Sequence, residues 1–369
     1  MRIVWFTWKD QKHPFAGGAE AVDREIAKQL VKDGHELLMI SGGFKGGKQE
    51  EMLADGYKVI RVGNYFSVYF EAYKYYQKHL QGWADIVIEE INTIPFMTQW
   101  YVKEKRILLV YQLCRIVWFY QLFFPLNIIG YLLEPIYLWL LRNNTVLTES
   151  ESTKKDFLNY GFNAKKIHVF PVSIEIKPLE SIEQKKTFNK FTILSLGSIR
   201  SMKRTLHQIK AFEIAKQKLP QIQMKIAGTF VGSYGQKCID YIKKSPYAAD
   251  IEYLGSISNT EKKELMKKSH LILVTSVKEG WGLIVTEAGS QGTPAIVYNV
   301  DGLRDSVVHN KTGLITEENT AQVMANNIIS LYNNKKQYQT FQTNTLEHSK
   351  KFTHSNSYKT FTKFILKQS

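Results

Sequence analysis

Two glutamates in the carboxyl-terminal half of the chain flank a glycine-containing loop, and they are the strongest candidates for chemistry. Glu279 and Glu287 stand with seven residues between them, and Gly280 and Gly282 lie just inside the first. Paired carboxylates can act as an acid and a base, or they can accept hydrogen bonds from ligand hydroxyls. Glycines beside them let backbone N–H groups approach a ligand closely.

The segments around these glutamates predict a βαβ unit. The apolar run 270–274 is typical of a buried parallel strand, a helix is expected over about 283–291, and a second apolar strand follows at 295–297. Units of this kind bind ligands at the loop where the strand gives way to the helix. We therefore expect the chemistry at the loop that begins near Glu279.

A second loop, residues 197–204, joins an expected strand at 191–196 to an expected helix at 205–218. Basic side chains beside a helix N-terminus suit a diphosphate, because lysine supplies a point charge, arginine a bidentate fork and the backbone its N–H donors. A solvated basic turn is the alternative interpretation. The three basic residues of the loop are Arg200, Lys203 and Arg204.

The amino-terminal segment predicts another βαβ unit, with a strand at 2–6, a helix at 19–32 and a strand at 36–40. Gly17 and Gly18 lie at its strand-to-helix turn. Paired glycines there permit close approach of an anionic ligand to the helix N-terminus. An ordinary glycine-rich turn explains the same pair equally well.

Length and charge narrow the class of protein. At 369 residues, 44% of them hydrophobic, the chain predicts two α/β domains of roughly 150–200 residues each. Its net charge of +15 calls for an anionic partner, namely nucleic acid, a phosphorylated small molecule or an anionic membrane face. Nucleic acid is the least favoured of these, because the sequence has no zinc-finger spacing, RNP-type motif or long basic tail.

The cysteines and the start of the chain bear on the expected location. Cys114 and Cys238 lie far apart and in no metal-type spacing, which is typical of reduced core residues in a cytosolic protein. The segment after Met1 has no signal-peptide pattern. We expect a cytoplasmic protein, with peripheral contact at the inner face of a membrane left open.

Residues 116–141 form an unusually apolar and aromatic segment bounded by Arg115 and Arg142. It approaches the length of a membrane span, but two prolines, a glycine and Glu134 interrupt it, so a span is not expected. Two interpretations remain. The segment is a loop and helix packed on the amino-terminal domain, or it is an aromatic surface that lies at a bilayer interface.

The run E-G-W-G-L-I-V-T-E-A, which begins at Glu279, resembles the E-x7-E signature of the retaining glycosyltransferases of family 4, which have the GT-B fold. Gly17-Gly18, the loop 197–203 and the segment 301–314 are similar to further parts of that family in the same order. The resemblance implies two Rossmann-like α/β domains that face each other across a cleft. The implied parts are an acceptor-binding domain at 1–175, a nucleotide-sugar-binding domain at 190–350, and a helix at 351–369 that crosses back to the first domain.

The resemblance also implies roles for single residues. Glu279 accepts hydrogen bonds from the donor sugar, Glu287 binds the ribose hydroxyls, and Lys203 neutralises the leaving diphosphate. Fixed positive charge and N–H dipoles suit a departing diphosphate. With Glu279 and Lys203 as the catalytic residues, the implied donor-binding residues are Gly17, Gly18, Ser198, Arg200, Arg204, Gly280, Trp281, Gly282, Leu283 and Glu287.

Two positions depart from the family pattern. Ser198 stands where the family often has an arginine, so Arg200 or Arg204 would supply that charge. No histidine follows the strand expected at 107–111, where the family often places one near the reacting sugar. Tyr111 and Arg115 stand there instead and are the acceptor-side candidates.

The resemblance implies retaining transfer of a hexose-type sugar from a nucleotide diphosphate sugar to a lipid-linked or polysaccharide acceptor, in the synthesis of a capsule, lipopolysaccharide or exopolysaccharide. The D-x-D pair of metal-dependent GT-A enzymes does not occur, so no required metal or other cofactor is expected. Two alternatives stay open: a GT-B-like epimerase or phosphorylase, and a non-catalytic nucleotide-sugar-binding partner of another transferase, which Tyr111 motivates.

Overall fold

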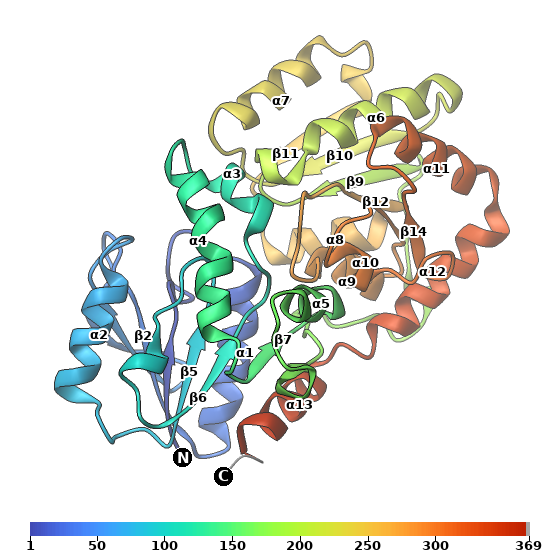
Figure 1. Ribbon diagram of the computed structural model, residues 1–369. Helices are drawn as coiled ribbons and strands as arrows, with labels where there is room; N and C mark the ends of the chain where they lie inside the picture. The colour runs from blue at the N-terminus through green and yellow to red at the C-terminus, as the bar shows by residue number, and fades with distance from the viewer. Residues whose placement is uncertain (367–369) are drawn as a thin grey trace. The chain divides into compact units, whose positions relative to one another are not determined.

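The computed structural model describes residues 1–366 and divides the chain into two compact units (Figure 1). Unit 1 contains residues 1–173 together with the last helix, α13 (His354–Leu366), and unit 2 contains residues 174–352. Each unit is a sheet of mostly parallel strands with helices packed on it, so the predicted pair of Rossmann-like α/β domains is confirmed. The sequence analysis expected this helix over 351–369, and residues 367–369 of that range lie outside the described part.

The sheet of unit 1 has eight strands in the order β3-β4-β2-β1-β5-β6-β7-β8, and every pairing except β3 with β4 is parallel. Its strands are β1 (Arg2–Phe6), β2 (Glu36–Gly42), β3 (Glu50–Met52), β4 (Lys58–Val62), β5 (Ile86–Glu90), β6 (Lys105–Leu109), β7 (Val146–Thr148) and β8 (Ile167–Val169). Its other helices are α1 (Gly18–Lys32), α2 (Val68–His79), α3 (Trp118–Gln121), α4 (Leu126–Leu141) and α5 (Glu151–Asn159).

Helices pack on both faces of this sheet, as the alternating side chains of β1 show. Trp5 stacks on Phe361 of α13, while the next residue, Phe6, packs against Tyr76 of α2. Successive strand residues point to opposite faces, so α13 and α2 cover opposite sides. Helix α13 also packs against α1, and in this way the end of the chain becomes part of the first unit's core.

The sheet of unit 2 has six parallel strands in the order β11-β10-β9-β12-β13-β14. Its strands are β9 (Thr192–Leu196), β10 (Gln223–Ala227), β11 (Ile251–Gly255), β12 (Leu271–Val274), β13 (Ala295–Val297) and β14 (Gly313–Ile315). Its helices are α6 (Thr205–Lys218), α7 (Gly232–Lys244), α8 (Asn259–Lys268), α9 (Leu283–Ser290), α10 (Leu303–Ser306), α11 (Ala321–Asn333) and α12 (Lys335–Ser349).

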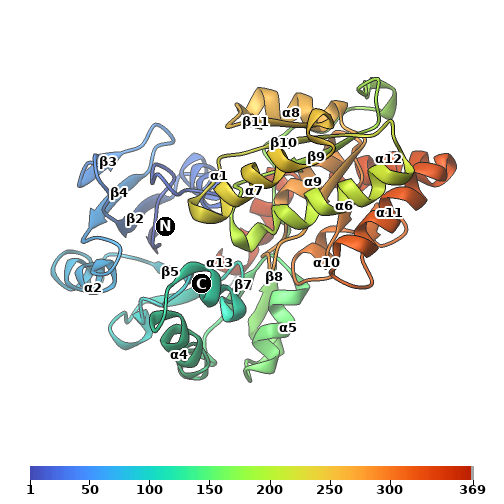
Figure 2. The same ribbon diagram turned by 90° about the horizontal axis from the view of Figure 1, so that it is seen from above.

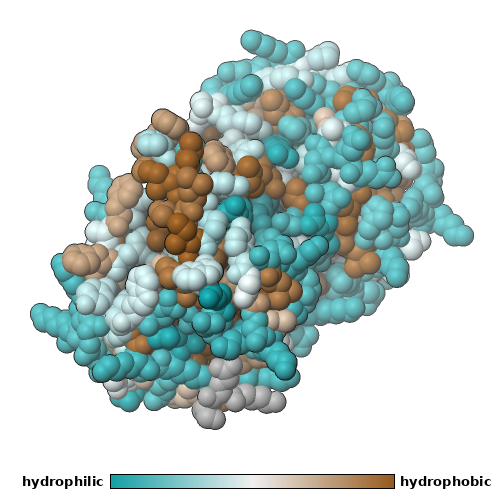
Figure 3. Space-filling view, in the orientation of Figure 1, coloured by the Kyte–Doolittle hydropathy of each residue, from teal (hydrophilic) through white to brown (hydrophobic). Residues whose placement is uncertain are grey.

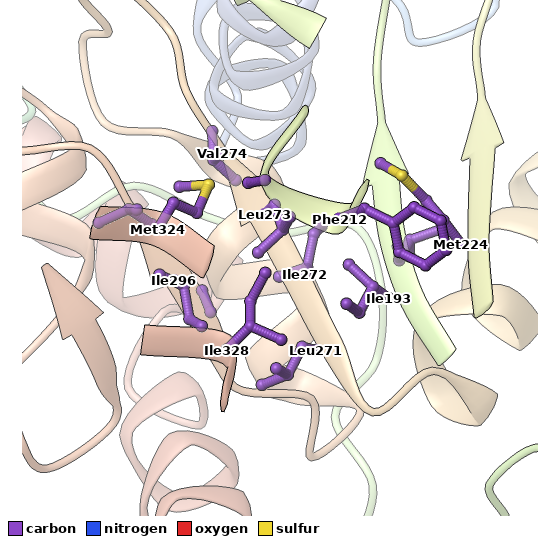
Figure 4. Packing of buried hydrophobic residues seen from close by; sticks show 14 of the residues in the cluster. Ile193, Phe212, Met224, Leu271, Ile272, Leu273, Val274, Ile296, Met324 and Ile328 are labelled. Atoms are coloured by element: carbon purple, nitrogen blue, oxygen red, sulfur yellow. The ribbon is translucent and has the colours of Figure 1, made fainter. Parts of the chain in front are cut away.

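The core of unit 2 lies around β12, whose four residues are all buried. Figure 4 shows Ile272 and Leu273 among side chains from β9, β13, α6 and α11. Helices α6 and α11 lie side by side over one part of the sheet (Figure 2), and α9 packs against α12 and α8. The continuous apolar run of β12 is what a strand covered on both faces requires.

The strand order of unit 2 changes direction between β9 and β12. From β9 the chain builds outward to β10 and β11, then returns to add β12, β13 and β14 on the other side. Such a switch point leaves a crevice outside the carboxyl ends of the two central strands, where ligands of open α/β sheets bind. The loops after β9 and β12 meet at this point.

Two details of the first unit differ from the sequence prediction. Strand β3 was not expected, because Glu50-Glu51-Met52 has no apolar alternation; it forms by antiparallel pairing with β4, supported by ion pairs from Lys58 to Glu50 and from Arg61 to Glu51. Strand β6 ends at Leu109, and Tyr111 therefore belongs to the loop after it and not to the strand.

The apolar segment 116–141 forms α3, a short connection and α4, and it packs on unit 1 as the first interpretation expected. One face of α4 is buried through Gly130, Tyr137, Leu138 and Leu141, while other large apolar side chains of the segment are exposed. Within residues 1–366, no helix combines the length and the apolar character needed to span a bilayer.

Candidate functional site

The loops after β9 and β12 are bonded to each other through side-chain and backbone contacts. The Thr275 hydroxyl donates to the carbonyl of Lys203 at 2.8 Å, and it accepts from Nε2 of Gln208 at 2.9 Å. The N–H of Val277 donates to the carbonyl of Met202 at 2.9 Å. These bonds hold the basic loop 197–204 in register with the loop that carries Glu279.

Lys203 and Glu279, which lie far apart in the sequence, meet in this site. Nζ of Lys203 lies 2.5 Å from Oε1 of Glu279, and the Ser276 hydroxyl donates to the same oxygen at 2.5 Å. Both side chains of the ion pair are partly exposed to solvent. A cation and an anion thus lie side by side at the switch point. There the lysine can bind an anionic ligand group, and the glutamate can accept hydrogen bonds from a ligand.

Two glycines allow the loop 279–282 to approach its neighbours. Gly282 has φ 92°, a left-handed conformation that starts α9. Gly302 has φ 79°, and a Cβ at that position would lie 2.2 Å from the carbonyl oxygen of Glu279. The N–H of Glu279 in turn donates to the carbonyl of Asp301 at 3.1 Å. The peptide of Glu279 is therefore held against the loop after β13.

Trp281 supports this loop from within. Its indole Nε1 donates to the Thr286 hydroxyl in the first turn of α9 at 2.8 Å, and its ring packs against Phe352. These contacts fit a packing role, since the indole N–H is already used inside unit 2. Gly280 precedes Trp281 in the loop, and Leu283 is the first residue of α9.

Glu287 lies one turn further along α9 and is almost fully buried. Nζ of Lys262, on α8, lies 2.6 Å from its Oε2. Burial raises the pKa of the Glu287 carboxyl, while the charge of Lys262 acts in the opposite direction. Glu279 and Glu287 thus each form an ion pair with a lysine.

The remaining basic-loop residues differ in exposure and conformation. Ser198 and Arg200 are exposed, and Arg204 has φ 50°, where it ends a 3₁₀ turn and precedes α6. The charge of Arg204 acts on His207 and Tyr298, whose side chains lie 2.9 Å apart. Lys203 of this loop therefore pairs with Glu279, whereas Arg204 acts on His207 and Tyr298.

In unit 1, the carboxyl ends of the strands gather acidic groups that the sequence analysis did not single out. Asp23 and Glu90 are buried and each acts on the ionisation of the other, and the Tyr111 hydroxyl donates to Oδ1 of Asp23. The Asn92 amide donates to Oε1 of Glu90 at 2.6 Å. A sequence signal existed, because Glu20 and Asp23 stand three residues apart in the first turns after the glycine pair and share a helix face.

Burial and mutual repulsion determine how these acids ionise. Burial raises the pKa of Glu90 to about 7, and the charge of Glu20 adds to the effect. Burial and Glu90 together raise the pKa of Asp23 well above its usual range, and burial beside these acids raises the pKa of Tyr111 as well. Because two close carboxylates disfavour double ionisation, the charge of Glu90 favours the protonated form of Asp23.

Gly17 and Gly18 begin α1 beside this acidic group. The N–H of Gly17 donates to Oε2 of Glu20 at 2.5 Å, and Nζ of Lys9 lies 3.1 Å from the other oxygen of that carboxylate. The first turn of α1 therefore uses one of its backbone donors internally. Both glycines are exposed to solvent.

Arg115 makes its contacts away from Tyr111. Its backbone N–H donates to Oε2 of Glu134 at 2.6 Å, and its guanidinium lies over the rings of Tyr131 and Tyr160. Glu134 also accepts from the indole of Trp118 at 2.9 Å. The structure thus separates the two acceptor-side candidates: Tyr111 belongs to the acidic group, and Arg115 belongs to the α3–α4 segment.

No group of three or more His, Cys, Asp or Glu side chains suited to a metal ion occurs in the part of the chain that the structure describes. Cys114 and Cys238 are buried, and neither forms a disulfide.

Two family profiles match adjoining parts of the chain. The profile described as "Glycosyltransferase Family 4" matches residues 16–177, and the profile described as "Glycosyl transferases group 1" matches residues 178–348. The boundary between them falls in the segment that joins the two units.

Among curated relatives, the poly(glycerol-phosphate) alpha-glucosyltransferase of Bacillus subtilis (strain 168) is 25% identical over 208 residues. The match covers 56% of this chain and 30% of the relative, so this chain spans less than a third of that protein's length.

Solved structures share the fold along the whole chain. Sucrose-phosphate synthase from Thermosynechococcus elongatus aligns with a TM-score of 0.81 at 15% identity, covering 100% of this chain and 98% of that chain. WaaG, described as a glycosyltransferase involved in lipopolysaccharide biosynthesis, aligns with a TM-score of 0.76 at 15% identity over 99% of both chains. Anabaena Alr3699/HepE, solved in complex with UDP and glucose, aligns with a TM-score of 0.73 at 15% identity over 99% of both chains.

The contact between Gly302 and Glu279 predicts a large loss of stability on adding one methyl group. Gly302→Ala introduces left-handed strain and also a clash with the carbonyl of Glu279, so the free energy of unfolding should fall by about 2 kcal/mol more than in Gly232→Ala. Gly232 has φ 61° and open space around its Cβ position, so that control carries the strain alone. Urea unfolding of both variants measures the difference, and equal losses would contradict the clash.

The acid pair predicts an unusual pH dependence of stability. The pKa of Glu90 is higher in the folded state, at about 7, than in the unfolded chain. The protonated Glu90 carboxyl therefore contributes its full stabilisation below the pKa that Glu90 has in the unfolded chain. As pH rises from there through about 7, the free energy of unfolding falls by up to about 3 kcal/mol. Urea unfolding from about pH 5 to about pH 8 tests this: Glu90→Gln should remove most of the slope, and a slope equal to that of the wild type would refute the assignment.

Proposed function

Because this chain belongs to glycosyltransferase family 4, we propose that it is a retaining glycosyltransferase that moves a hexose-type sugar from a nucleoside diphosphate sugar to an acceptor of cell-surface glycan synthesis. The observation that carries the proposal is the ion pair of Lys203 and Glu279 at the switch point of unit 2. Glu287 lies nearby in the chain, one turn into α9. The complex of Alr3699/HepE with UDP and glucose, and the described role of WaaG, support the choice of donor and product class.

Donor binding would exchange partners within this site. Lys203 leaves Glu279 and moves to the diphosphate, and Glu279 then accepts hydrogen bonds from the sugar hydroxyls. Glu287 accepts from the ribose hydroxyls. The diphosphate and the sugar hydroxyls thereby replace the ion pair of Lys203 and Glu279, whose side chains are both partly exposed, so that solvent weakens their attraction.

In the transfer step, the bond from the sugar's anomeric carbon to the diphosphate oxygen breaks, and the acceptor hydroxyl oxygen bonds to that carbon on the same face. The acceptor proton passes to the leaving diphosphate, so no side chain is needed as the base. Lys203 and the N–H groups at the start of α9 stabilise the charge that develops on the diphosphate. Arg200 and Arg204 add positive charge on the same loop. Together these cations and N–H groups support a reaction that requires no divalent metal ion.

The exposed surface of unit 1 favours a lipid-linked acceptor over a free polysaccharide. Figure 3 shows a continuous hydrophobic area over α4. Glu134 is the only charged residue of α4, and it is buried, so the exposed face of this helix has no charged side chain. The exposed large apolar residues of this α3–α4 surface are Ile116, Phe119, Tyr120, Phe123, Phe124, Ile128, Ile129, Leu132, Leu133, Ile136 and Trp139.

An apolar area of this kind, with basic ends in a chain of net charge +15, fits the inner face of an anionic bilayer. Arg115 and Arg142 bound the segment, and the guanidinium of Arg142 lies 4.3 Å from the ring centroid of Trp139. Aromatic rings with a cation beside them are favoured at headgroup depth. We propose peripheral attachment through the α3–α4 surface, which would bring the enzyme to acceptors anchored in the same membrane.

The roles of the two glutamates can be separated by comparing nucleotide with nucleotide sugar. Glu279→Gln should bind UDP as tightly as the wild type or more tightly, because it frees Lys203, yet lose at least about a hundredfold in sugar transfer. Glu287→Gln should weaken UDP and UDP-glucose alike by about tenfold or more. Calorimetry with each ligand, followed by transfer assays on membrane extracts with a panel of donors, measures both effects.

Three outcomes of that experiment decide between functions. If the wild type binds no nucleotide sugar from the panel, the transferase proposal fails. Binding without turnover, equal in the wild type and Glu279→Gln, would favour a non-catalytic partner of another transferase. Inversion at the anomeric carbon of the product would refute retention.

Membrane attachment predicts a loss of vesicle binding when the tip of the α3–α4 surface becomes polar. Phe123 and Phe124 are 72% and 73% exposed. Their joint change to Ser should weaken flotation with phosphatidylglycerol-containing vesicles at least about tenfold, because each buried aromatic ring contributes about 2 kcal/mol.

Met52→Ser is the matched control, since Met52 is a large exposed apolar residue of the same unit, on the edge strand β3. Its binding should equal that of the wild type. Unchanged flotation of the Phe123 and Phe124 variant, or equal loss in the control, would exclude the α3–α4 surface as the attachment site.

A further inference from the structure

The buried carboxylate of Glu287 has a partner whose position is determined by its own helix. Nζ of Lys262 lies 2.6 Å from Oε2 of Glu287, and the exposed fractions of the two side chains are 24% and 8%. Lys262 stands in the first turns of α8, and Glu287 lies on α9, which packs against α8. The pair therefore joins two helices of unit 2 and is distinct from the pair of Lys203 and Glu279.

The first turn of α8 is built rigidly around this lysine. The Ser258 hydroxyl accepts from the N–H of Glu261 at 3.2 Å, and the Glu261 carboxylate accepts from the N–H of Ser258 at 2.7 Å. This reciprocal cap fixes the start of the helix immediately before Lys262. The cap fixes the backbone at the start of α8, and the ion pair with Glu287 places the Lys262 ammonium against α9.

A ribose diol imposes a requirement on Glu287. Two hydroxyl groups donate best to an ionised carboxylate, which offers two acceptor oxygens, whereas a protonated carboxyl keeps a hydrogen that competes with them. Burial alone favours the protonated form, and the charge of Glu175, in the segment before β9, favours it further. Lys262 is the cation that opposes both influences.

We infer that Lys262 is a positioning residue that keeps Glu287 ionised and ready for the ribose, and that it thereby sets the pH range in which the chain binds a nucleoside diphosphate. The inference rests on the proposed function, in which Glu287 binds the ribose. Lys262 acts through Glu287, and the hydroxyls of the nucleotide would meet the carboxylate oxygens and not the ammonium.

Removal of the cation should therefore produce a pH-dependent defect. In Lys262→Met, Glu287 takes up a proton at higher pH than in the wild type, because burial is no longer opposed. UDP affinity should then fall at least about tenfold near pH 6 and recover toward the wild-type value near pH 8.5. Lys262→Arg keeps the charge and should retain affinity at both values.

Calorimetric titration with UDP across this pH range provides the test, with Lys268→Met as the matched control. Lys268 lies on the same helix and pairs at the surface with Glu264. The control should follow the wild type, and Glu287→Gln should bind weakly at every pH. A Lys262→Met variant that binds like the wild type, or that is weakened by one constant factor at every pH, would overturn the inference.

A second measurement does not depend on nucleotide binding. The carboxyl ¹³C chemical shift of Glu287, assigned with Glu287→Gln, reports its pKa directly. Lys262→Met should raise that pKa by about one unit or more, and an unchanged value would overturn the inference by itself. If the wild type binds no UDP while the pKa responds as expected, the proposed function fails and the electrostatic role of Lys262 stands.

Discussion

The hydrogen-bonded pairing of β9 with β12 is the constraint on which the candidate site depends. Parallel neighbours end at the same edge of a sheet, so the loops after these strands must lie together whatever their sequences. The bonds of Thr275 and Val277 to the basic loop then fix their register. Lys203 and Glu279 meet because two central strands are adjacent, and everything proposed about the donor follows from that meeting.

Both glutamates of the site hold a lysine, but the two ion pairs have different physical character. The lysines of the two pairs are about equally exposed, but the Glu279 side chain is 15% exposed and that of Glu287 only 8%. Burial raises the pKa of the Glu287 carboxyl, so without a nearby cation it would take up a proton more readily. The proposed roles follow this difference between the carboxylates: Lys203 moves toward the diphosphate, and Lys262 stays beside Glu287.

The two units differ in chemical character in a way that matches different ligands. Unit 2 places cations and helix N-termini at its strand ends, which suits a nucleotide diphosphate. Unit 1 places the acid pair of Asp23 and Glu90 beside its glycine turn, and it also carries the α3–α4 surface. The buried Glu134 links that surface to the loop after β6 through Cys114 and Arg115.

The sequence by itself predicted the two α/β halves and most of their strands and helices, because apolar periodicity and glycine position are local properties. The family followed from the resemblance of the run that begins at Glu279 and of the other segments similar to that family. The sequence also singled out Lys203, Glu279 and Glu287 as candidates. Tertiary structure alone decided which side chains meet: Lys262 with Glu287, Tyr111 with Asp23, and the edge strand β3 with β4. These pairings depend on strand order and helix packing between residues distant along the chain, and no local pattern encodes that order. The ionisation of Asp23, Glu90 and Glu287 was likewise beyond the sequence, because burial is a property of the folded chain.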